Sequence, residues 1–151
     1  GMIEHTRDIS RLLCPVSMER GSLVCALDDL VERCSKVFGI KCNLSSDMSV
    51  EINDPDMAVN LYRIAQEAMT NSLKHGKASR IDIELVSNFN KIEMDIRDDG
   101  VGIDDRSFEE SIGMGIGIQS MKYRASLIGG SLYLKRVSDG GGTVVIFLLS
   151  R

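Results

Sequence analysis

Residues 61–75 read Leu-Tyr-Arg-Ile-Ala-Gln-Glu-Ala-Met-Thr-Asn-Ser-Leu-Lys-His, and this stretch decides the fold that we expect. Small and apolar side chains recur in it at helical spacing and form one face, made of Leu61, Ile64, Ala65, Ala68, Met69, Ser72 and Leu73. Asp54-Pro55 predicts the start of the helix, because aspartate caps helix N-termini and proline fits the first helical position. The sequence therefore predicts an amphipathic helix that runs from Pro55 to about His75 and ends at Gly76.

Further elements are predicted on both sides of that helix. Upstream, a helix from Ser22 to Phe38 carries one apolar stripe, formed by Leu23, Ala26, Leu27, Leu30, Cys34 and Val37. A short strand over 40–44 follows it. Downstream of Gly76 the apolar period changes from about 3.6 to about 2 residues, which predicts strands over 81–85 and 92–96. A helix over 117–128 comes next, and strands near 131–137 and 143–149 flank a glycine-rich turn as a hairpin.

The order of these elements favours an α+β fold. Helices and strands are partly segregated, so we expect a two-layer α/β sandwich, in which a mixed sheet is backed by about three helices. A strictly alternating βαβ dinucleotide-binding domain does not fit this order. Residues 3–14 carry apolar side chains at helical spacing up to Pro15, which predicts a residual N-terminal helix whose partner surface is missing.

The composition is typical of one globular domain and argues against several classes of function. A net charge of −4 over 151 residues does not favour a nucleic-acid partner, which needs a basic surface, and 5% aromatic residues do not favour base stacking. No apolar run approaches the roughly 20 residues of a membrane helix, so we expect a cytoplasmic domain without membrane contact. The cysteines, which form no CxxC pair, are expected to be free buried thiols, with zinc binding as the remote alternative: Cys14, Cys25, Cys34 and Cys42.

Polar residues share a second face of the predicted helix over 55–75. Arg63, Glu67, Asn71 and Lys74 follow one another at steps of four, four and three residues. A solvated stripe is one interpretation. However, asparagine is a poor residue for a helix interior, and its amide oxygen there suits a magnesium ion, which takes oxygen ligands. Glu67, one turn away, could then orient or deprotonate a water or a substrate group.

A second polar motif, Asp98-Asp99-Gly100-Val101-Gly102, follows the strand predicted over 92–96. The alternation of that strand points Asp98 inward, where a carboxylate is costly unless a donor meets it. The exocyclic amine of adenine would be such a donor, and the glycines would let a flat ring approach the backbone. An ordinary Asp-Gly turn after a strand remains the alternative.

A third motif, Gly113-Met-Gly115-Ile-Gly117-Ile-Gln-Ser-Met121, precedes the helix predicted over 117–128. Glycine-rich backbone that leads into a helix N-terminus offers free N–H groups and a partial positive charge to phosphates. Taken alone, the motif also fits a flexible surface loop. It is neither a P-loop nor a Rossmann fingerprint, since it lacks the Gly-Lys-Ser/Thr ending and the required glycine spacing.

In this order the three motifs resemble the N, G1 and G2 boxes of the gyrase, heat-shock chaperone, histidine kinase and mismatch-repair (GHKL) ATPases. The sequences of residues 62–75 and 115–124 resemble the corresponding segments of the histidine kinases that sense nitrate and membrane fluidity. The resemblance covers roughly residues 9–149. It implies the Bergerat fold of that superfamily, with residues 2–20 as the remnant of a dimerisation-domain helix and linker and residues 21–151 as the ATP-binding catalytic domain.

The resemblance also implies a role for each site residue. It makes Glu67 the catalytic residue and Asn71 the ligand of Mg²⁺. Asp98 would accept a hydrogen bond from the adenine amine, and residues 103–114 would form a short ATP lid. The residues that it assigns to ATP binding are Asn71, Lys74, His75, Asp98, Gly100, Gly102, Ile103, Gly113, Gly115, Gly117, Ile118 and Thr143.

Two departures from the family pattern stand out. Asp99 occupies a position where asparagine is more usual. We expect this difference to adjust the properties of the ATP site rather than to abolish ATP binding. No phosphoacceptor motif of the Glu-Leu-His-Asp kind is present, and His5 lies too close to the ATPase region to leave room for a second dimerisation helix. We therefore interpret His5 as an exposed helix residue and expect the acceptor histidine outside this chain.

The function expected from this resemblance is that of a histidine kinase catalytic domain. It would bind Mg-ATP and transfer the γ-phosphoryl group to a histidine of a separate dimerisation domain, for onward transfer to a response regulator. The full-length protein could be anchored in a membrane. Two alternatives are a serine kinase of the anti-sigma type and a non-catalytic nucleotide-binding or scaffold module.

Overall fold

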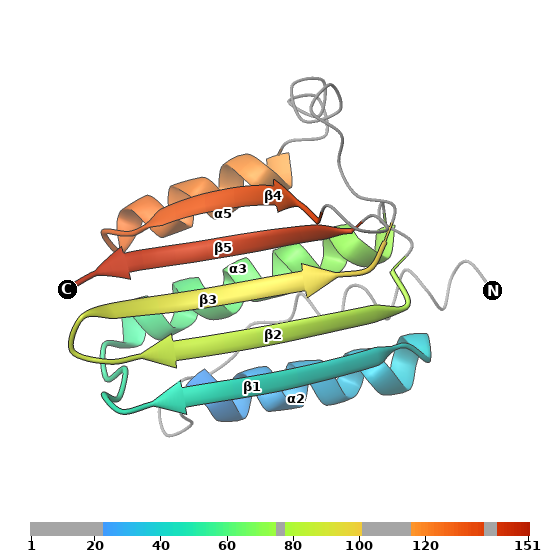
Figure 1. The fold of residues 1–151 in the computed structure, drawn as a ribbon, viewed down its shortest axis with the longest axis horizontal. Coiled ribbons are helices and arrows are strands. Elements are labelled where there is room, and N and C mark those ends of the chain that lie inside the picture. Colours follow the sequence, from blue (N-terminus) through green and yellow to red (C-terminus); the bar gives the residue numbers. More distant parts are fainter. Residues whose placement is uncertain (1–22, 75–77, 101–115, 138–141) are drawn as a thin grey trace.

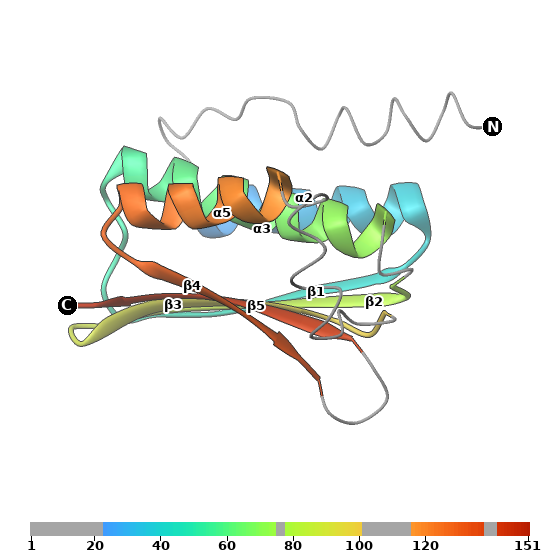
Figure 2. The ribbon, with the colours of Figure 1, turned by 90° about the horizontal axis from the view of Figure 1, so that it is seen from above.

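The computed structural model describes residues 23–74, 78–100, 116–137 and 142–151, which form two layers. Three helices of these residues cover one face of a five-stranded sheet, as the view from above shows (Figures 1 and 2). The elements are α2 (Leu23–Phe38), β1 (Lys41–Met48), α3 (Pro55–Lys74), β2 (Arg80–Ser87), β3 (Lys91–Asp98), α5 (Ile116–Leu127), β4 (Ser131–Arg136) and β5 (Thr143–Ser150). Within the described ranges, no helix combines the length and the apolarity that crossing a membrane requires.

The sheet is mixed and has the strand order β1-β2-β3-β5-β4. β1 and β2 are parallel and are connected through α3, whereas every other neighbouring pair is antiparallel. This arrangement confirms the expected α+β sandwich with a mixed sheet and three helices. The residual N-terminal helix and the boundary near residue 20 lie outside the described residues and stay predictions.

The core lies between the helices and the sheet, as the apolar patterns predict. Alternate residues of β2 and β3 are buried, including Ile83 and Met94, and they pack with buried residues of α3 such as Leu61 and Met69. Because Asp98 continues the alternation of Ile92, Met94 and Ile96, its side chain belongs to the same buried face. The alternation of β3 therefore places the Asp98 carboxylate on the face of the sheet that the helices cover.

Two sequence-based expectations about α2 and β1 need correction. β1 runs over Lys41–Met48 rather than 40–44, because it pairs with β2 along its whole length despite the polar residues in its second half. Val37 is 37% exposed, and Val31 is buried instead, since the buried stripe of α2 follows positions 23, 27, 30, 31 and 34.

The expectation that the cysteines are buried holds for only some of them. Cys34 is buried, Cys42 is half-buried and Cys25 is exposed. Cys25 lies two residues from both Leu23 and Leu27, which places it on the side of α2 that faces away from the core. Cys14 lies outside the described residues.

Asp99 ties the end of β3 to the start of β2. Its carboxylate accepts hydrogen bonds from the Ser79 hydroxyl at 2.6 Å, the Ser79 N–H at 2.8 Å and the Arg80 N–H at 2.9 Å. These donors, the Ser79 hydroxyl foremost, lower the pKa of Asp99 below its usual value. An asparagine offers only one acceptor oxygen. The carboxylate at this position therefore fastens the strand end that carries Asp98.

We predict that Asp99→Asn destabilises the domain by about 1 kcal/mol at neutral pH, because an exposed, charge-assisted contact is lost. A group with a lowered folded-state pKa contributes stability above its unfolded pKa and loses it as pH falls through the folded value. The difference between wild type and variant should therefore be constant near neutral pH and vanish in acid, as the pH falls below 3.8, the ordinary pKa of an aspartate, and through the lower pKa of Asp99 in the folded state. Urea unfolding of both proteins across this range measures it, and a difference that grows on acidification would contradict the contact.

Candidate functional site

The polar residues singled out by the sequence gather at one end of the two layers. The C-terminal part of α3, the end of β3, the start of β5 and the first turn of α5 all lie at this end (Figure 1). α3 packs directly against α5, β2 and β3. Segments that are far apart in the sequence therefore come together here.

Asp98 is the centre of this arrangement, since it is only 9% exposed and three donors within the described ranges meet its carboxylate. The Ser72 hydroxyl of α3 donates to Oδ2 at 2.6 Å. The N–H groups of Gly100 and Thr143 donate to Oδ1 at 2.9 and 3.2 Å. The buried carboxylate is thus compensated within the protein, so its burial alone does not require an external donor. An ionised carboxylate has about four acceptor positions, one more than these donors of the described residues use.

Ser72 is a site residue that the sequence analysis missed, because it was counted with the apolar face of the helix. Its Oγ also lies 3.0 Å from the carbonyl oxygen of Ala68. A hydroxyl has one proton, and the shorter contact is the one to the charged oxygen of Asp98. The sequence did contain a signal for Ser72, because a hydroxyl on a buried helix face needs a hydrogen-bond acceptor. Its partner, however, lies 26 residues away and only the tertiary fold identifies it.

The polar face of α3 meets the first turn of α5 at Gly117. A Cβ added to Gly117 would collide with a carboxylate oxygen of Glu67 and lie 3.3 Å from Nδ2 of Asn71. Glu67 and Asn71 are both half-buried, which a freely solvated stripe would not produce. Glycine therefore lets the N-terminal turn of α5 approach a carboxylate and an amide, and it joins the first and third sequence motifs.

The other members of the polar stripe have different surroundings. Arg63 lies about two helical turns before Asn71, and its guanidinium donates a hydrogen bond to Oε1 of Gln66 at 2.9 Å. Lys74, in the last turn of α3, is exposed. Glu67 and Asn71, the two middle residues of the stripe, face the first turn of α5 at Gly117.

Gly142 and Thr143 lie directly against the end of β3. Gly142 has a φ of 103°, and a side chain there would collide with the carbonyl oxygen of Asp98. This close approach brings the Thr143 N–H to the Asp98 carboxylate. The structure thus places Thr143, which is 8% exposed, beside Asp98, while a role for its hydroxyl stays a prediction.

The remaining predicted residues are described only in part. Ile118 is partly buried and packs against the core. Five predicted ATP-binding residues lie outside the described residues, namely His75, Gly102, Ile103, Gly113 and Gly115.

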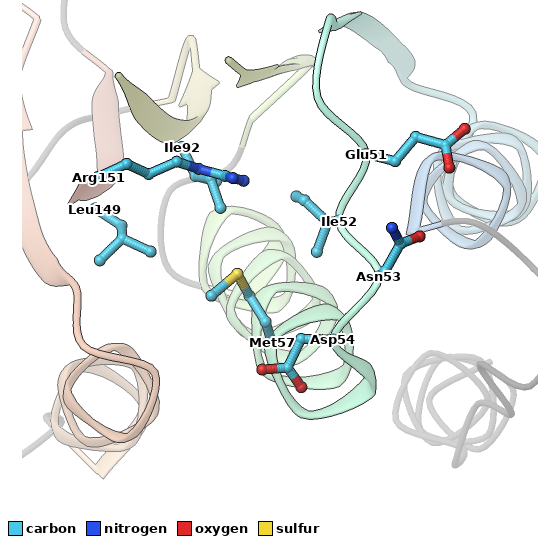
Figure 3. A pocket seen from close by; sticks show the side chains of 8 residues that line it. All are labelled: Glu51, Ile52, Asn53, Asp54, Met57, Ile92, Leu149 and Arg151. Atoms are coloured by element: carbon cyan, nitrogen blue, oxygen red, sulfur yellow. The ribbon is translucent and has the colours of Figure 1, made fainter. Parts of the chain in front are cut away.

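A separate cavity of about 280 Å³ opens at the other end of α3 (Figure 3). Apolar and charged side chains both line it, namely Glu51, Ile52, Asn53, Asp54, Met57, Ile92, Leu149 and Arg151. None of the predicted site residues lines it. α3 has 20 residues and so spans about 30 Å, which separates this cavity from the surroundings of Asp98.

Comparison with known proteins relates this geometry to a family. Residues 56–151 match the family model described as histidine kinase-, DNA gyrase B- and HSP90-like ATPase. The chain is 28% identical over 145 residues to the oxygen sensor histidine kinase NreB of Staphylococcus carnosus, covering 96% of the chain and 41% of that relative. It is 34% identical over 142 residues to the sensor histidine kinase ComP of Bacillus subtilis, covering 93% and 18%. The chain thus spans less than half the length of these relatives.

Solved structures share the fold. The histidine kinase domain of an Erythrobacter litoralis blue-light activated histidine kinase aligns with a TM-score of 0.66 at 20% identity, over 97% of this chain and 71% of that one. The ATP binding domain of PrrB from Mycobacterium tuberculosis aligns with a TM-score of 0.67 at 21% identity, over 87% and 96%. The chain is homologous to the ATP-binding catalytic part of sensor histidine kinases, and it belongs to the family of histidine kinase-, DNA gyrase B- and HSP90-like ATPases.

Proposed function

We propose that this chain binds Mg-ATP and delivers the γ-phosphoryl group to a histidine outside it, as the catalytic domain of a sensor histidine kinase. Membership of the ATPase family supports the nucleotide. The observation that carries the proposal is the buried Asp98 carboxylate, which three donors of the described residues hold in place while using three of its about four acceptor positions. A fixed and largely buried charged acceptor suits the exocyclic amine of adenine.

The neighbouring groups fit the other half of the ligand. The Asn71 amide oxygen and the Glu67 carboxylate are oxygen donors of the kind that Mg²⁺ prefers, and a magnesium ion usually keeps several waters beside a few protein ligands. Both face the first turn of α5 at Gly117. Free N–H groups and the positive end of the helix dipole favour phosphate groups at such a turn. We assign Asn71 to the metal and Glu67 to catalysis.

This assignment divides the work among residues of the chain. When bound, Mg²⁺ would neutralise phosphate charge. Glu67 would orient or deprotonate the attacking group, Asn71 would fix the metal, and Lys74 would supply positive charge from the end of α3. We also assign the predicted residues outside the described ranges, such as His75, to the surroundings of the phosphates. Positioning and charge neutralisation dominate phosphoryl transfer, so this set of roles is sufficient for the chemistry.

The partners follow from the proposed reaction. The acceptor is a histidine on a dimerisation domain, and a response regulator receives the phosphoryl group next. The relatives named as sensor histidine kinases support this pathway, although the chain spans only part of each. We place the domain in the cytoplasm, whether or not the full-length protein is anchored in a membrane.

We predict that Mg-ATP raises the melting temperature of the domain, since a ligand at a hundredfold its Kd stabilises the native state by about 2.7 kcal/mol. Asn71→Ala should lose most of this shift, because the proposed metal ligand is removed. Asp98→Ala should lose it too and should also lower the melting temperature without ligand, because Ser72 and two N–H groups lose their acceptor. Differential scanning fluorimetry measures both quantities.

Asn60→Ala is the matched control for Asn71→Ala. Asn60 is also a half-buried asparagine of α3, but it bonds to the Asp56 carbonyl and to Arg124, away from Gly117. This control should keep the ligand-induced shift. A shift that survives both Asn71→Ala and Asp98→Ala would place the nucleotide elsewhere.

The role of Asp98 can be tested by base selectivity. Asp98→Asn keeps the shape of the side chain but replaces a charged acceptor by a neutral amide. We expect ATP affinity to fall about 10- to 100-fold, as for the loss of a charge-assisted hydrogen bond. GTP presents a carbonyl oxygen where ATP presents its amine, so the preference for ATP over GTP should narrow in the variant. Competition titrations with both nucleotides measure it, and an unchanged preference would remove Asp98 from base recognition.

The proposed reaction can be tested by supplying the missing acceptor. With a dimerisation domain that carries the histidine, γ-labelled ATP should give an alkali-stable, acid-labile phosphoryl group on that domain. Glu67→Gln should slow the transfer by about 100-fold or more while it keeps the ATP-induced thermal shift. An acid-stable label on serine would favour the anti-sigma type of kinase. Normal ATP binding without any transfer would favour a scaffold.

A further inference from the structure

Two cysteines, Cys34 and Cys42, lie where α2 packs on the edge strand β1. Cys34 lies on the buried stripe of α2 and is fully buried, whereas Cys42 is half-buried on the face of β1 that the helices cover. Both side chains belong to the same packed cluster, in which Cys42 packs against the core that contains Cys34. The Cys42 N–H also donates to the hydroxyl of Ser35, the residue next to Cys34, so the two cysteines lie close together although they belong to different secondary structure elements.

The turn between α2 and β1 holds this pair in place. Ser35, next to Cys34, donates through its hydroxyl to the Ile40 carbonyl at 2.9 Å, and its Oγ accepts from the Cys42 N–H at 3.2 Å. Gly39 has a φ of 66°, and its N–H donates to the Ser35 carbonyl at 2.9 Å, which closes the helix end. The turn between α2 and β1 thus holds the backbone at both cysteines in place through short-range hydrogen bonds.

We propose that Cys34 and Cys42 form a thiol–disulfide site, in which oxidation by a small-molecule disulfide locks α2 to the sheet edge. The two positions suit the two roles of such a site. Cys42 is partly accessible to solvent and therefore starts the exchange. Cys34 is buried, so it reacts second, with the sulfur of Cys42. Nothing in the proposed phosphoryl transfer uses either thiol.

The electrostatics of the pair agree with this division of roles. The neighbouring Cys34 thiol is the largest influence and lowers the pKa of Cys42, although burial and the charge of Asp82 oppose this effect. The neighbouring Cys42, together with burial, raises the pKa of Cys34. The thiolate is the reactive form in exchange with a disulfide, so the first attack belongs to Cys42.

The reaction balances with one small-molecule disulfide. The Cys42 thiolate attacks one of its sulfurs, which forms a mixed disulfide and releases one thiolate. The Cys34 sulfur then attacks the Cys42 sulfur, and the second thiolate leaves with the proton of Cys34. Two protein thiols are oxidised, and the small-molecule disulfide is reduced to two thiols.

The wild-type sequence allows a direct test, because trypsin separates the four cysteines. Cleavage after Arg33, Lys36, Lys41 and Arg63 puts Cys34 on peptide 34–36 and Cys42 on peptide 42–63, whereas Cys25 falls on peptide 21–33 and Cys14 on peptide 12–20. After incubation with oxidised glutathione and alkylation, mass spectrometry should find peptide 34–36 joined to peptide 42–63, lighter by two hydrogen atoms and separated by reduction. Recovery of these two peptides singly, or joined only to peptide 21–33, would overturn the proposal.

Variants provide a second measurement. Cys25→Ser, which replaces the exposed cysteine of α2, should keep the linked peptide and the loss of two thiols on oxidation. Cys42→Ser should abolish both effects. In the Cys25→Ser background oxidation should also raise the melting temperature by roughly 5 °C or more, because a disulfide restricts the unfolded chain. A fall in the melting temperature on oxidation would show that the folded α2–β1 turn cannot accommodate a Cys34–Cys42 disulfide.

Discussion

The hydrogen bond between Ser72 and Asp98 is the contact on which the rest of this structure depends. It joins the helix layer to the middle of the sheet at 2.6 Å, and the carboxylate that accepts it is only 9% exposed. A buried charge is strongly destabilising unless donors surround it. Here the donors come from α3, from the backbone after β3 and from the start of β5. One carboxylate therefore sets the relative positions of three segments that are far apart in the sequence.

Close backbone approaches complete the same end of the molecule. Glycine is required at Gly142, where a side chain would collide with the Asp98 carbonyl, and at Gly117, where it would collide with Glu67. Asp99, the next residue along, fastens the strand end to β2 through the Ser79 hydroxyl and two N–H groups. This end of the molecule thus brings rigid elements together, with the Asp98 carboxylate at the end of β3 and the Glu67 and Asn71 side chains of α3 beside Gly117.

Much of this could be predicted from the sequence where the signal is local. The apolar spacing of α3 and the alternation of β3 predicted the α+β sandwich and the inward direction of Asp98. Local patterns did not predict the pairing that extends β1 to Met48, because its second half is polar. They also counted Ser72 as an ordinary face residue and suggested an external donor for Asp98, since only the tertiary fold brings the internal donors to it.

The most direct measurement of the central claim is a structure of the domain with magnesium and a non-hydrolysable ATP analogue. We predict that the adenine amine donates to the Asp98 carboxylate, and that the metal is bound by the Asn71 side-chain oxygen beside Glu67. The account would be contradicted by a nucleotide bound at the other end of α3, in the cavity lined by Met57 and Arg151, or by a base that leaves Asp98 without contact.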